Sequence, residues 1–165
     1  ICIKRANIRR IENITRRNIY LNLQYHIKEA EEHNQTPNTP SVIMFLTLNE
    51  ALKVVFEEGI QRTIRRYQED AAIIRKGLRK LNLEFLLKDK SVMSNTVTSV
   101  FLPAEIDVKG FINEMDNEGY VLYPGKGSLL KRNLFQVANM GEIFPEDCKE
   151  LIRIIEIFLK RRIKS

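Results

Sequence analysis

The chain has 165 residues, of which 44% are hydrophobic and 29% are charged, and its formal net charge is +6. This composition excludes a disordered chain, because it supplies enough apolar side chains for a buried core. No apolar run reaches the ~20 residues of a membrane-spanning helix, and the first residues lack the layout of a signal peptide. Cys2 and Cys148 form no disulfide framework, so we expect a cytoplasmic protein without a membrane partner.

The basic residues concentrate at the two ends of the chain. Residues 1–18 carry a net charge of +5 and residues 159–164 a net charge of +4, so the remainder is acidic, with a net charge of −3. A nucleic-acid-binding domain usually concentrates its basic residues on a folded face. We therefore favour solvated ends and expect no nucleic-acid partner. The alternative is a non-catalytic basic α+β module that binds RNA or a protein partner.

The first forty residues show weak structural signals. Residues 1–5 alternate as an edge strand does, and because the chain opens in this way we expect it to be a piece of a longer protein. Residues 6–18 are polar and basic, and residues 19–32 are weakly helical. Residues 33–40 are rich in turn formers and contain two prolines, which predicts a linker or a functional loop.

Two long helices follow. Residues 41–58 are apolar helix formers, and Gly59 is a natural stop. From Ile60 to Leu81, apolar residues recur every three or four positions, which predicts an amphipathic helix.

The polar face of this second helix carries pairs of opposite charge four residues apart. These pairs are Arg65 with Glu69 and Arg66 with Asp70. Such pairs stabilise an exposed helix by a few tenths of a kcal/mol each. We therefore interpret the face as solvated.

From Asn82 the hydrophobic period shortens and elements of both kinds alternate. Strands are expected at residues 83–87, 96–102, 120–123 and 133–138, and helices at residues 107–118 and from Pro145 to about residue 162. This order predicts an α+β fold, a two-layer domain whose mainly antiparallel sheet is covered by helices and preceded by long helices.

The residues alone define no self-contained active site. His26 and His33 are the only histidines and have no ligand-forming neighbours, so no metal site is expected. The glycines and lysine of residues 123–127 suit either an anion-binding loop or a plain connection between strands. The hydroxyls of Thr36 and Thr39 suit either phosphate binding or capping of the helix that starts near Ser41.

Several segments, in order along the chain, resemble the C-terminal part of class V pyridoxal-phosphate aminotransferases of fold type I. The resemblance is strongest to the 2-aminoethylphosphonate–pyruvate aminotransferases, and a class V lyase such as a cysteine desulfurase is an alternative within the same class. The segments are residues 36–41, 49–52, 57–59, 119–126, 135–141 and 143–147. The Tyr-Pro-Gly-Lys element and the Asn-Met-Gly element with its following Pro-Glu-Asp are the most specific of them.

The resemblance implies a homodimeric enzyme that transfers an amino group from a small-molecule donor to pyruvate or a similar keto acid. In such enzymes a lysine binds the cofactor pyridoxal 5′-phosphate covalently. That lysine lies upstream of the matching region, so we expect the fragment to bind no cofactor and to be inactive alone. Residues 1–40 then correspond to a remnant of the large cofactor-binding domain with the connecting segment, and residues 41–165 to the C-terminal small domain.

The resemblance assigns roles to two residues and no catalytic residue. Thr39 matches a threonine that reaches the cofactor phosphate of the neighbouring subunit. Gln136 stands where the family usually has an arginine that holds the substrate's carboxylate or phosphonate. Because Gln has no charge, either the amino donor differs or Lys126, Lys131 or Arg132 supplies the positive charge.

Overall fold

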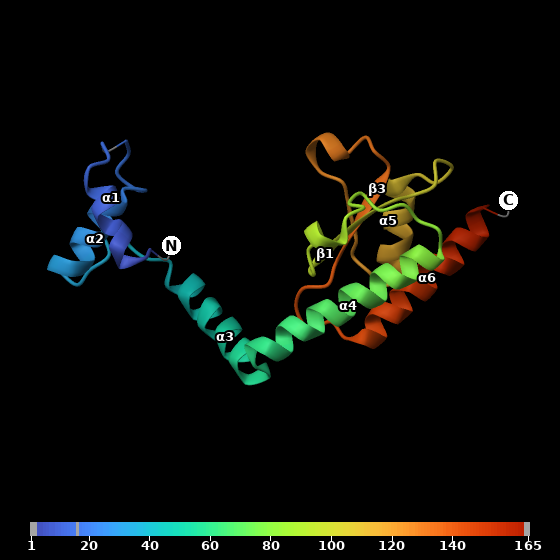
Figure 1. Ribbon diagram of the computed structural model, residues 1–165, viewed down its shortest axis with the longest axis horizontal. Helices are drawn as coiled ribbons and strands as arrows, with labels where there is room; N and C mark the ends of the chain where they lie inside the picture. Colours follow the sequence, from blue (N-terminus) through green and yellow to red (C-terminus); the bar gives the residue numbers. More distant parts are fainter. Residues whose placement is uncertain (1–2, 16, 164–165) are drawn as a thin grey trace. The chain divides into compact units, whose positions relative to one another are not determined.

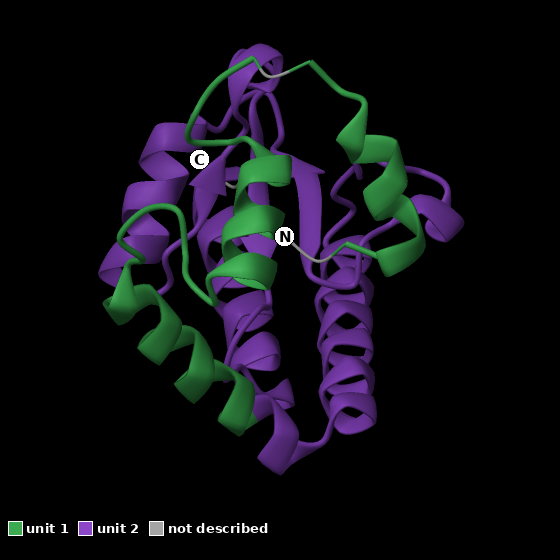
Figure 2. Cartoon of the chain, turned by 90° about the vertical axis from the view of Figure 1, so that its left-hand side faces the viewer, with its two compact units in different colours: residues 1–54 green, residues 55–165 purple. Residues whose placement is uncertain are grey.

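The computed structural model describes residues 3–15 and 17–163, and it divides the chain into two compact units (Figure 1). The first unit spans residues 1–54 and the second spans residues 55–165 (Figure 2). Among the described residues, none of the helices combines the length and the hydropathy of a membrane span.

The first unit contains short helices and most of the long helix α3 (Val42–Glu58). A 3₁₀ turn at Arg5–Asn7 leads into α1 (Ile8–Glu12), and α2 (Leu23–Glu32) follows. Helix α2 begins later than residue 19 because the Asn22 side chain caps it by accepting a hydrogen bond from the backbone N–H of Tyr25 at 2.8 Å.

The prediction of a strand at residues 1–5 is wrong for residues 3–5, which are the ones that the structure describes. Ile3 and Lys4 belong to no strand and a 3₁₀ turn begins at Arg5, whereas Ile1 and Cys2 lie outside the described residues. Alternation of apolar residues forms a strand only where another strand is available for pairing.

The two long helices are confirmed. Helix α3 (Val42–Glu58) ends at Gly59, whose φ of +89° is a conformation that glycine adopts readily, and α4 (Ile60–Lys80) follows directly. Within α4, the apolar stripe buries Ala71, Ile74 and Leu78.

The second unit contains an antiparallel sheet of three strands in the order β1-β3-β2. Its strands are β1 (Val97–Phe101), β2 (Tyr123–Pro124) and β3 (Leu134–Ala138), with short 3₁₀ turns at Lys90–Val92 and Gly127–Leu129. The strand predicted at residues 83–87 is reduced to one bridge between Phe85 and Val100. The strand predicted at residues 120–123 begins only at Tyr123.

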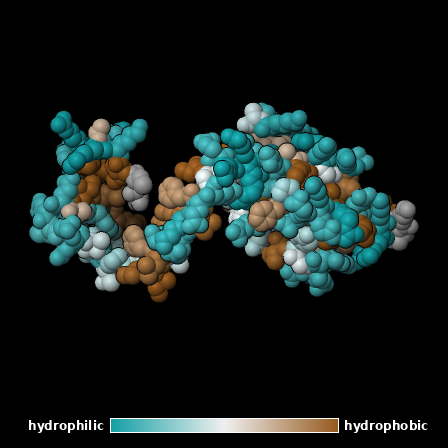
Figure 3. All heavy atoms as spheres, turned by 90° about the horizontal axis from the view of Figure 1, so that it is seen from below, coloured by the Kyte–Doolittle hydropathy of each residue, from teal (hydrophilic) through white to brown (hydrophobic). Residues whose placement is uncertain are grey.

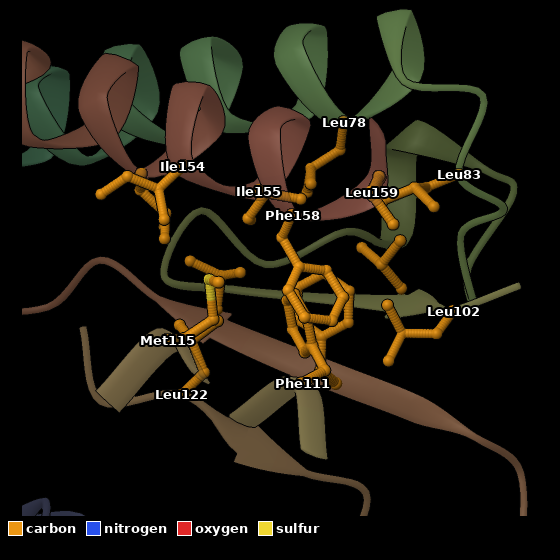
Figure 4. Close-up of a cluster of buried hydrophobic side chains, with 14 of the residues drawn as sticks. Leu78, Leu83, Leu102, Phe111, Met115, Leu122, Ile154, Ile155, Phe158 and Leu159 are labelled. Carbon is orange, nitrogen blue, oxygen red and sulfur yellow. The ribbon is translucent and has the colours of Figure 1, made fainter. Parts of the chain in front are cut away.

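Three helices cover one face of this sheet and enclose the core. Helices α4, α5 (Val108–Asn117) and α6 (Pro145–Ile163) contribute side chains to one hydrophobic core, which includes Phe111 of α5. The ring centroid of Phe111 lies 4.7 Å from that of Phe135 and 5.2 Å from that of Phe158. Figure 4 shows the side chains of α6 pointing toward Phe111 and Met115. The predicted α+β class, with an antiparallel sheet covered by helices, is confirmed.

The solvated polar face predicted for α4 is wrong at two positions. Asp70 is completely buried, and Arg66 has a side-chain exposure of only 17%. The guanidinium of Arg66 pairs with Glu58 at 2.7 Å and donates to backbone carbonyls of the loop that precedes α6. This loop and α6 come from far along the chain, so the helical pattern of α4 alone did not reveal them.

Candidate functional site

Gln136 lies at the centre of the sheet, on the face opposite the core. Its neighbours Phe135 and Val137 belong to the hydrophobic core, and side chains alternate between the two faces of a strand. In the sheet register, Gln136 stands between Ser99 of β1 and Tyr123 of β2. We call the surface formed by these three residues, with Phe101, the outer sheet face.

A hydrogen bond across the strands orients the amide of Gln136. Its Nε2 donates to Oγ of Ser99 at 3.0 Å. One N–H of the amide is therefore used within the sheet, and the carbonyl oxygen is oriented away from Ser99 as an acceptor. The outer sheet face thus presents a neutral group with both a donor and an acceptor, where an arginine would present only donors.

Two cations rest on aromatic rings of the same face. Nζ of Lys126 lies 5.7 Å from the ring centroid of Tyr123, and the guanidinium carbon of Arg132 lies 5.0 Å from that of Phe101. Both contacts have the geometry of a cation–π interaction. Two positive charges therefore rest on rings of the face that carries Gln136. The third cation considered from the sequence, Lys131, has no comparable ring contact in the described part of the chain.

The loop at residues 123–127 is a structured connection. The N–H of Gly125 donates to the carbonyl of Leu134 at 3.1 Å, so it is used by the sheet. A Cβ atom at Gly125 would lie 2.7 Å from the carbonyl oxygen of Leu129, and Gly127 has a φ of +58°. These two glycines are explained by close backbone approach and turn geometry.

Thr39 lies in the first unit, in the loop before α3. Its side chain is exposed, and nearby Thr36 donates from its hydroxyl to the carbonyl of Asn38 at 2.9 Å. Nδ2 of Asn38 is buried and has no acceptor among the described residues. The unbonded N–H groups of the first turn of α3 follow immediately, so this segment gathers donors that suit a phosphate group.

The histidines serve local contacts. Nε2 of His26 lies 2.8 Å from the carbonyl of Tyr20, and Nδ1 of His33 lies 3.2 Å from the carboxylate of Glu29. Within the described residues, no three His, Cys, Asp or Glu side chains are grouped closely enough to hold a metal ion.

Asp70 and Cys148 form a buried polar pair that the sequence did not indicate. Burial raises the pKa of Asp70, and the charge of Arg66 opposes this rise. Burial, together with the neighbouring carboxyl of Asp70, raises the pKa of the Cys148 thiol to about 12. Because this thiol stays protonated at neutral pH, it is not a nucleophile.

Comparison with known proteins places these features in context. No family model matches the chain. An uncharacterized aminotransferase of Methanocaldococcus jannaschii is 33% identical over 141 residues, which are 86% of this chain and 36% of that protein. A 2-aminoethylphosphonate–pyruvate transaminase of Phocaeicola vulgatus is 36% identical over 105 residues, or 63% of this chain and 28% of that protein. The chain is homologous to aminotransferases.

Solved structures of fold-type I aminotransferases share the fold of this aminotransferase homologue. An aspartate aminotransferase of Thermus thermophilus has a TM-score of 0.76 at 19% identity, and the match covers 93% of this chain and 42% of that one. An alanine–glyoxylate aminotransferase of Nostoc sp. also has a TM-score of 0.76, at 21% identity, and covers 98% of this chain and 42% of that one. The chain therefore spans only about a third of the length of the curated relatives that it matches.

Proposed function

We propose that the chain is the C-terminal part of a pyridoxal-phosphate-dependent aminotransferase that transfers an amino group from 2-aminoethylphosphonate, or a related donor, to pyruvate or a similar keto acid. The observation that carries this proposal is the sequence identity of 31–36% to 2-aminoethylphosphonate–pyruvate transaminases of several bacteria. The activity belongs to a longer, homodimeric protein, in which residues 1–40 join the large domain and residues 41–165 form the small domain.

The cofactor would contact this chain through its phosphate. When bound, pyridoxal phosphate supplies the electron sink for reactions at the amino-bearing carbon. The Thr39 hydroxyl and the unpartnered amide of Asn38 suit an anionic group beside the start of α3. The lysine that holds the cofactor lies upstream in the family that this chain resembles, so residues 1–165 alone are inactive under this proposal.

The outer sheet face would bind the acidic group of the substrate. Lys126 and Arg132 provide positive charge, and Gln136 donates and accepts hydrogen bonds at a position fixed by Ser99. This arrangement holds the substrate more weakly than a two-point contact with arginine would.

The surface of α3 supports the proposal that a larger protein surrounds it. Most of the large apolar side chains of this helix are at least half exposed, including Ile43 at 74% and Phe45 at 64%. Figure 3 colours such residues brown at the molecular surface. Exposed apolar patches of this extent mark contact surfaces.

A basic binding module is the weaker candidate. Near the C-terminus, Lys160 pairs with Glu156 at 2.5 Å and Arg162 pairs with Glu114 at 2.9 Å. Such pairing reduces the positive potential that a nucleic-acid surface requires.

An activity assay on the longer protein that contains this chain tests the proposal. Incubated with pyridoxal phosphate, 2-aminoethylphosphonate and pyruvate, it is expected to form alanine and to show the visible absorbance of the bound cofactor. Residues 1–165 under the same conditions are expected to form none. Absence of turnover with every amino donor, together with salt-dependent RNA binding, would favour the binding module instead.

A further inference from the structure

A cavity of about 190 Å³ lies in the second unit, between α4, the segment that follows it, and β1. Its walls are mostly apolar and come from Phe85, Leu87, Val92 and Met93. Leu87 is 45% exposed and Val92 is 62% exposed, so the apolar walls reach the surface. The guanidinium of Arg75 lines the same cavity.

Arg75 has no acidic partner in the described part of the chain. Its Nε donates to Oγ1 of Thr98 at 3.2 Å, and its Nη2 donates to the backbone carbonyl of Ser94. Both acceptors are neutral. A guanidinium has five N–H groups, and these two bonds leave its remaining donors without a protein acceptor among the described residues.

A second cation stands one helical turn further along α4. The guanidinium carbon of Arg79 lies 4.9 Å from the ring centroid of Phe85, which is part of the cavity wall. Burial, together with the like charge of Arg79, lowers the pKa of Arg75. Two positive charges therefore lie beside one apolar cavity, and in the described part of the chain neither Arg75 nor Arg79 forms an ion pair with a carboxylate.

We propose that this cavity binds a small organic carboxylate. Its carboxylate oxygens accept hydrogen bonds from the unused N–H groups of Arg75, with Arg79 adding charge at the rim, and its apolar body packs against Phe85, Leu87 and Met93. Arginine and carboxylate match in geometry and charge.

The walls and the size of the cavity narrow the class of ligand. A purely polar anion such as phosphate leaves the apolar walls without a partner, whereas a carboxylate with a short aliphatic chain covers them. The volume is below that of pockets that hold drug-sized ligands, so the ligand is a short one. This inference does not depend on the proposed aminotransferase function.

Titration of the full, isotope-labelled chain with hexanoate tests the proposal by NMR. The Nε–Hε signal of Arg75 and the methyl signal of Met93 are expected to shift together and to saturate, with a Kd on the order of 1 mM. Hexanamide has nearly the same shape without the charge, and phosphate has charge without an apolar body. Each is expected to bind about tenfold more weakly or worse.

Two variants and a control locate the site. Arg75→Gln removes the positive charge of the guanidinium. Leu87→Asp places a negative charge at the exposed rim of the cavity without disturbing a buried residue. Each substitution is expected to weaken hexanoate binding about tenfold. Arg62→Gln, at an exposed position of the same helix, is expected to leave binding unchanged. Non-saturating shifts, equal binding of hexanamide, or unchanged binding in both Arg75→Gln and Leu87→Asp would each overturn the proposal.

Discussion

The guanidinium of Arg66 and the carboxylate of Glu58 form a two-point ion pair, with Nε 2.7 Å from Oε1 and Nη2 2.9 Å from Oε2. The remaining nitrogen of the guanidinium donates to the carbonyls of Gly141 at 2.7 Å and Ile143 at 3.1 Å. A single side chain therefore joins the end of α3, the start of α4 and the loop that leads into α6.

Glu58→Gln is expected to remove part of the acid sensitivity of the second unit. The hydrogen bonds from Arg66 and Thr63 hold the pKa of Glu58 at about 2, below its ordinary value of 4.5. Because the folded-state pKa is the lower one, the stabilisation is complete above pH 4.5 and is lost as the pH falls toward 2. Urea unfolding across this pH window should show a shallower decline for Glu58→Gln. Glu57→Gln is the control, and equal declines in both variants would contradict the assignment.

Asp70→Asn is expected to stabilise the protein at neutral pH. Burial raises the pKa of Asp70, so the folded state favours the neutral acid. The stabilisation from the neutral carboxyl group of Asp70 is complete below the ordinary pKa of 3.8, and it is lost as the pH rises through the folded-state pKa. Asn keeps the shape without the charge, and a gain of about 1 kcal/mol at pH 7 would raise Tm by about 3 °C. The gain should vanish in acid. Glu69→Gln at the neighbouring exposed position should show no such gain.

The elements that the sequence predicted are those whose pattern is local. The period of α4 and the alternation of β1 and β3 depend on side chains within each segment. Burial of Asp70, by contrast, depends on residues more than seventy positions later, and the reduced strand near Phe85 depends on its pairing with Val100.

The same distinction applies to the candidate site. Alternation with Phe135 and Val137 is enough to place Gln136 away from the core. The contact of Gln136 with Ser99 depends on strand register, which no local pattern supplies. The place of Arg75 beside a cavity is likewise not indicated by the pattern of α4, because the other walls of that cavity come from later segments.

Gly77→Ala is expected to destabilise the packing of α4 on α6. A Cβ atom at Gly77 would lie 2.6 Å from side-chain carbons of Ile152, so either the Ile152 side chain or the two helices would have to shift. Overpacking of this kind costs about 1–3 kcal/mol, which exceeds the gain in helix propensity of up to ~1 kcal/mol.

Gly110→Ala in α5 is the matched control for this substitution. The nearest atom to its added Cβ would be Oδ2 of Asp107 at 3.7 Å, an ordinary contact. Thermal unfolding should therefore show a lower Tm for Gly77→Ala and an unchanged or higher Tm for Gly110→Ala. A loss of equal size in both variants would mean that helix packing is not the cause.

The exposed apolar side chains of α3 are expected to make the isolated chain self-associate. Ile43→Glu and Phe45→Glu replace two of the most exposed of these residues by charged ones. Light scattering at increasing protein concentration should show less association for the double variant than for the unmodified chain. Glu57→Gln, a change at a polar position of the same helix, should associate as the unmodified chain does.

Gln136→Arg is expected to strengthen binding of an anionic amino donor by the longer aminotransferase. The guanidinium would offer two parallel hydrogen bonds where the amide offers one donor and one acceptor. A decrease of about tenfold in KM for 2-aminoethylphosphonate, with kcat nearly unchanged, would fit a role in binding alone. Ser99→Ala frees the amide of Gln136 without adding charge, so KM should rise in that variant. If KM is unchanged in both variants while turnover persists, the outer sheet face does not bind the donor, although the aminotransferase assignment would stand.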